Sequence, residues 1–167
     1  MNGKTIGKGL VVLFGALVFI SCNKDKNKAQ DTIQFNGITA TDAIGEYIFF
    51  DTTDWRLHDQ WTDKEHALLG PPLPAMTNDA ISAIVCFPNP SAKQSFIYQI
   101  GKTTGTQLQY AIVDRHYKVL LQGLDTGFNT TINTAALGII DTVRMYYRIV
   151  RNDSACYGHG DIAIVKL

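Results

Sequence analysis

The sequence predicts an all-β protein, an antiparallel β-sandwich with one short helix near residues 63–69. Short runs of β-branched and aromatic residues recur at roughly 8–12-residue intervals, and Gly, Pro and Asn separate them, as is typical of sandwiches. Several of these runs alternate between apolar and polar residues, which indicates strands with one buried face. Only one segment carries the start and stop signals of a helix.

The clearest alternation lies in 142–150 and puts Val143, Met145, Tyr147 and Ile149 on the buried face. It leaves Arg144, Tyr146 and Arg148 on the solvent-exposed face. A register shift of one residue would exchange the two faces. A second alternating run, 95–100, places Phe96, Tyr98 and Ile100 on one face. Strands are expected over 46–50, 80–87, 95–100, 106–114, 117–122, 128–134, 142–150 and 161–166.

The expected helix begins at a capping box. Thr62 can accept a hydrogen bond from the backbone of Glu65, whose side chain can reach back to Thr62. The helix would continue through Leu69 and end at Gly70, followed by two prolines.

The amino terminus has the three parts of an export signal. Lys4 and Lys8 precede a 12-residue apolar run, 9–20, which ends in Ser21-Cys22. A membrane-spanning helix needs about 20 apolar residues, so the run has the length of a signal peptide's core. Phe19-Ile20-Ser21-Cys22 resembles the bacterial lipobox, although an ordinary secretory signal with an incidental cysteine is an alternative.

The resemblance implies that residues 1–21 are a lipoprotein signal peptide and that Cys22 carries the lipid that binds the membrane. Residues 22–35 form a flexible tether, because 23–31 contain no apolar side chain larger than alanine. Residues 36–167 form a single sandwich domain. The Lys/Asp-rich stretch after Cys22 resembles the export signals of Bacteroidetes surface lipoproteins. It implies an outer-membrane lipoprotein of the cell envelope, with the surface favoured over the periplasm.

Composition excludes one class of partner. The chain has 15 basic and 15 acidic side chains, and two of the basic ones, Lys4 and Lys8, leave with the signal peptide. The remainder is slightly acidic and has no basic stripe, so a nucleic-acid partner is not expected.

Cys86 and Cys156 are the two cysteines besides Cys22. In an oxidising compartment they are candidates for one disulfide. The alternative is two separate buried thiols, because cysteine packs well as a small apolar residue.

A second resemblance covers residues 86–167. Phe87-Pro88-Asn89-Pro90, two alternating strands and a final Asp-Ile-Ala-Ile-Val-Lys resemble the C-terminal sorting domains of the Bacteroidetes type IX secretion system. The resemblance implies an Ig-like sandwich. The turn at 114–118 departs from the family's Asp-x-x-Gly-Lys pattern.

Four residues between the helix and the preceding strand are a candidate binding surface: Trp55, His58, Asp59 and Trp61. Indole rings can stack on a sugar or a peptide, and a carboxylate can orient an imidazole. The alternative is that both tryptophans close the open edge of the sandwich.

No catalytic or metal-binding motif stands out. His159 and Asp161 can both ligate metals, but a site needs three or four ligands, and the flanking glycines indicate a tight turn into the last strand. No serine lies in a Gly-x-Ser-x-Gly motif. The sequence therefore predicts no enzyme and no cofactor.

The leading expectation is a tethered binding or assembly module with a protein or glycan partner. One alternative is a small envelope hydrolase or metal-dependent enzyme centred on His58, Asp59 and His159. Another is a purely structural envelope component.

Overall fold

The computed structural model describes residues 32–76 and 81–166. The expected signal peptide, Cys22 and most of the expected tether lie outside these residues.

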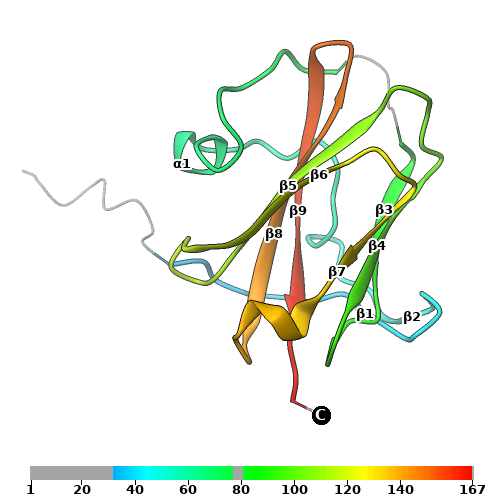
Figure 1. The fold of residues 1–167 in the computed structure, drawn as a ribbon, viewed down its shortest axis with the longest axis vertical. Helices are drawn as coiled ribbons and strands as arrows, with labels where there is room; N and C mark the ends of the chain where they lie inside the picture. Colours follow the sequence, from blue (N-terminus) through cyan, green and yellow to red (C-terminus); the bar gives the residue numbers. More distant parts are fainter. Residues whose placement is uncertain (1–31, 77–80, 167) are drawn as a thin grey trace, which may run out of the picture.

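Two antiparallel sheets form a sandwich (Figure 1). One sheet has three strands in the order β3 (Ala83–Phe87), β4 (Ser95–Ile100) and β7 (Asn129–Ile132). The other has four, in the order β6 (Val119–Asp125), β5 (Gln107–Val113), β8 (Thr142–Arg151) and β9 (Ser154–Ala163). A small hairpin, β1 (Ala40–Thr41) and β2 (Tyr47–Phe49), lies beside the three-stranded sheet. The prediction of an all-β antiparallel sandwich is confirmed.

The helical parts are short. The helix α1 spans Asp63–His66, and the capping box between Thr62 and Glu65 is present as expected. The helix is shorter than predicted, because the chain continues from 67 to 69 as turns. A 3₁₀ turn, η1, spans Thr134–Leu137.

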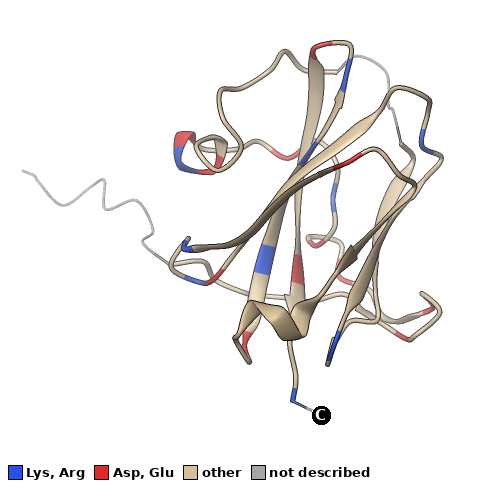
Figure 2. Ribbon diagram, viewed as in Figure 1, with Lys and Arg blue, Asp and Glu red and all other residues tan. Residues whose placement is uncertain are grey.

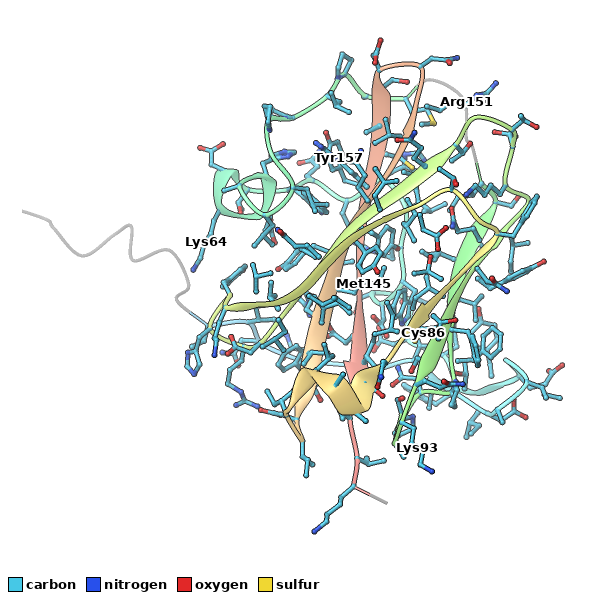
Figure 3. The ribbon with its side chains drawn as sticks, viewed as in Figure 1. Lys64, Cys86, Lys93, Met145, Arg151 and Tyr157 are labelled. Carbon is cyan, nitrogen blue, oxygen red and sulfur yellow. The ribbon has the colours of Figure 1, made fainter. Side chains whose placement is uncertain are left out.

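The core lies between the two sheets. Figure 3 shows Met145 and Cys86 among the side chains that fill this space. The central residues have no solvent exposure at all: Ile97, Leu108, Ile112, Ile132, Val143, Met145, Tyr147, Ile149 and Ile162. The predicted inward face of 142–150 is therefore correct.

The prediction that the opposite face of the same strand is exposed to solvent is wrong. Tyr146 is 1% exposed and Arg148 is 9% exposed. Ile33 and Val113 form a second buried cluster with Tyr146, and Trp61 and Leu68 pack against it. Ile33, Trp61 and Leu68 thus cover Val113 and Tyr146 on the outer face of the four-stranded sheet, so much of both faces of β8 is shielded from water.

The alternating residues of β4 share a face, but it is the outer one. Tyr98 and Ile100 are 42% and 40% exposed, whereas Ser95, Ile97 and Gln99 point into the sandwich and have no exposure. Two of these side chains are polar: Ser95 donates to the Pro88 carbonyl, and the Gln99 amide nitrogen donates to the Gly127 carbonyl, whereas the Gln99 amide oxygen has no hydrogen-bond partner among the described residues.

Cys86 and Cys156 are not bridged; each is a separate buried thiol within the core. Burial raises the pKa of the Cys86 thiol well above its usual range.

The Phe-Pro-Asn-Pro motif fixes the chain between the hairpin and β9. The Asn89 side chain is completely buried and donates to the carbonyls of Thr39 and Asp161, both at 2.8 Å. It also accepts from the backbone N–H of Ala163 at 2.9 Å. One side chain thus joins three segments that are far apart in sequence.

Candidate functional site

Trp55 belongs to the core rather than to a binding surface. It is 8% exposed and stacks on Tyr147, with ring centroids 6.1 Å apart. Its φ of 54° and that of His58, 65°, bracket a turn that directs the indole inward.

The glycines on either side of His159 make room for this packing. The predicted tight turn at 158–161 is wrong, because these residues lie within β9. A Cβ at Gly160 would overlap the Trp55 ring, and one at Gly158 would overlap the Tyr147 ring and the Arg56 carbonyl. Both glycines are therefore required by close packing rather than by a turn.

Trp61 is half-buried in an aromatic cluster on the outer face of the four-stranded sheet. Its ring centroid lies 4.8 Å from that of Tyr157 and 5.6 Å from those of His66 and Tyr146. Trp61 therefore packs on the outer face of the sheet.

Asp59 and His159 come together as a close pair. The Nδ1 of His159 lies 2.6 Å from one Asp59 oxygen, and Arg56 lies 2.7 Å from the other. Burial opposes ionisation of Asp59, but His159 and Arg56 outweigh it, and the pKa of Asp59 is lowered. His58 is exposed. Such a pair can orient an imidazole for proton transfer.

A second cluster of charges lies between β8, β9 and the segment before Trp55. Arg144 and Asp161 face each other across the two strands, at the adjacent basic and acidic positions in Figure 2, and their side chains are 2.7 Å apart. Asp54 is 4% exposed and accepts hydrogen bonds from the backbone of Thr39 and of Asp161, both at 2.8 Å.

The carboxylates of this cluster ionise with difficulty. Burial raises the pKa of Asp54 to about 6, although its backbone hydrogen bonds act in the opposite direction. Burial also raises the pKa of Asp161, even though Arg144 favours its ionised form. In residues 32–76 and 81–166, no group of three or more His, Cys, Asp or Glu side chains could hold a metal ion.

A groove of about 680 Å³ lies beside the start of the described chain. We call it the tether-root groove. Its walls are residues 32–34 and 36, the first turn of α1 with its cap Thr62, Tyr117 and Arg144. The Nζ of Lys64 lies 3.9 Å from the centre of the Tyr117 ring. The groove thus offers an aromatic face together with charges of both signs, from Asp63, Lys64 and Arg144.

Sequence reasoning did not find this groove. The capping box did place Asp63 and Lys64 at a helix start, but no local pattern indicates that residues 32–34 and 36 line a groove together with that helix. The Arg144–Asp161 pair was also missed, because a charge in an alternating strand normally indicates a solvent-facing position.

No family model, no curated protein and no solved structure matches the chain. Within the part of the chain that the structure describes, no helix has the length and apolar character needed to cross a membrane.

Proposed function

We propose that the protein is a lipoprotein of the cell envelope, tethered through lipid on Cys22, and that it acts as a binding or assembly module. The Ser-Cys end of the apolar run supports the anchor. The Lys/Asp-rich stretch after it and the likeness of residues 86–167 to sorting domains support an outer-membrane protein of Bacteroidetes, exposed at the surface.

The tether-root groove is the observation that carries the binding role. It is about 680 Å³ in volume, within the range of small-ligand and side-chain pockets. Exposed Lys64 and Asp63 and the Tyr117 ring line it, and this mixture of aromatic and charged groups suits a polar segment of a protein or a glycan. In this proposal the groove holds the partner close to the membrane, since the tether begins at its edge.

Photocrosslinking in cells tests the groove. Lys64→benzoylphenylalanine places the probe at the groove, and Lys93→benzoylphenylalanine places a control on a distant part of the surface (Figure 3). We expect one discrete adduct from position 64 and none from position 93. The adduct should disappear when Tyr117→Asn is added, because asparagine tolerates the φ of 62° at this position but lacks the ring. Equal adducts from both positions, or none from 64, would contradict the groove.

The 2.6 Å contact between Asp59 and His159 favours a second candidate, an envelope hydrolase in which His159 acts as the base. An esterase or peptidase activity of the purified protein that His159→Gln abolishes would establish it.

A further inference from the structure

The hairpin formed by β1 and β2 carries an unusual amount of exposed apolar surface. Within residues 40–50, which we call the apolar hairpin, five large apolar side chains are more than half exposed: Ile44 77%, Tyr47 52%, Ile48 71%, Phe49 58% and Phe50 54%. Soluble proteins usually scatter such residues singly, and a concentration of them marks an interaction site. In Figure 1 the hairpin projects beyond the edge of the three-stranded sheet.

The apolar hairpin is folded and holds its side chains in place. Ala40 pairs with Phe49, and Thr41 pairs with Tyr47. The rings of Tyr47 and Phe50 meet edge to face, with centroids 5.2 Å apart. The exposed apolar side chains therefore form an ordered protrusion on the surface of the protein.

Several polar backbone groups of the turn have partners within the turn. One oxygen of Asp42 accepts hydrogen bonds from the N–H groups of Ile44 and Glu46, both at 2.9 Å. The N–H of Asp42 donates to the Glu46 carbonyl at 3.0 Å. A segment can leave water at low cost only when such groups have partners, because an unpaired backbone group in an apolar medium is very unfavourable. The N–H groups of Asp42, Ile44 and Glu46 meet this condition.

The lengths of the connecting segments allow the hairpin and the lipid anchor to reach the same membrane. Residues 23–31 span about 30 Å when extended, and Thr32 to Ala40 span less than about 30 Å. A protruding apolar hairpin can insert into a lipid surface, which deforms around it. A protein partner would instead need a pocket of matching shape. The hairpin carries Asp42 and Glu46 and no basic residue, so uncharged headgroups suit it better than anionic ones (Figure 2).

We infer that the apolar hairpin inserts into the surface of the lipid leaflet that carries the anchor. This inference builds on the lipid anchor of the proposed function and adds an orientation to it. The lipid keeps the domain near the membrane, and the hairpin fixes which side of the sandwich faces the bilayer. Aromatic and aliphatic side chains at such a boundary bury their apolar parts in the interface.

Vesicle flotation of the mature chain, residues 22–167 with Cys22→Ala, tests the hairpin without the lipid. We expect binding to phosphatidylcholine vesicles and weaker binding when phosphatidylglycerol is added. The double variant Ile48→Asp with Phe49→Asp should reduce binding roughly tenfold or more, because it removes two apolar side chains from the contact.

The matched control is Leu124→Asp with Phe128→Asp, which changes two residues of similar exposure, 58% and 62%, outside the hairpin. It should bind as the parent does, and thermal melts should show that both double variants are folded. Equal losses of vesicle binding in the two double variants would overturn the inference. Failure of the parent protein to bind vesicles would also overturn it, and would indicate that the hairpin docks on a protein. Neither outcome bears on lipidation of Cys22, which is measured separately in cells.

Discussion

The guanidinium of Arg144 and the carboxylate of Asp161 form an ion pair that is largely shielded from water. Their side chains are 16% and 2% exposed. The pair makes two hydrogen bonds, at 2.7 and 2.8 Å, so each carboxylate oxygen has a partner. Burial opposes the charge of Arg144, but Asp161 outweighs it and raises the pKa of Arg144 further.

Arg144→Ala should therefore destabilise the protein by about 3–5 kcal/mol, since it leaves the Asp161 carboxylate buried without its partner. The surface pair Arg115–Asp141, whose side chains are 49% and 38% exposed, is the control. Arg115→Ala should cost about 1 kcal/mol or less. Urea unfolding of both variants measures the difference, and similar losses would show that the Arg144 pair is not shielded as described.

Arg148 shows why a charged residue in this strand does not indicate a solvent-exposed position. Its Nε donates to the Gln109 side chain at 2.7 Å and its Nη1 to the Pro71 carbonyl at 3.0 Å. The alternation in 142–150 correctly identified the core face, because that face depends on the strand itself. It could not show that the loop from 61 to 73 covers the other face, since that contact joins segments about 80 residues apart.

Among the elements, β9 was predicted with the largest error in length. It spans Ser154–Ala163, whereas the sequence predicted a strand only from 161. Gly158 and Gly160 caused the error, because glycine is a turn signal wherever no partner is known. The partner here is the ring of Trp55, which occupies the space above Gly160.

Gly160→Ala provides a test of this packing. Alanine normally stabilises a strand relative to glycine by about 0.5–1 kcal/mol. Here the added methyl group would overlap the indole, so we expect a loss of about 1–3 kcal/mol. The Trp55→Leu variant should itself be less stable than the wild type. In that variant, Gly160→Ala should lower the free energy of unfolding only slightly or raise it. Chemical denaturation of the four proteins of this cycle measures the coupling, and purely additive effects would contradict direct contact.

At the scale of the whole molecule, the sandwich could be predicted because it depends on many strands at once. Misplacing a boundary in β3 or β9 leaves the two-sheet architecture unchanged. The tether-root groove depends instead on the placement of residues 32–34 and 36 near α1, Tyr117 and Arg144, for which the sequence carries no local signal. Of the candidate binding residues, the structure uses Trp55 and Trp61 for packing and joins Asp59 to His159.

Both proposed roles depend on the anchor, because the groove is proposed to hold a partner close to the membrane and the apolar hairpin is proposed to insert into that membrane. Lipid attachment needs the Cys22 thiol, and no other cysteine follows a small residue at the end of an apolar run. The direct measurement is metabolic labelling of cells with an alkyne fatty acid, followed by isolation of the wild-type protein and of Cys22→Ala. We predict label on the wild type, membrane-bound, and none on the variant; equal labelling of both would contradict the lipid anchor at Cys22.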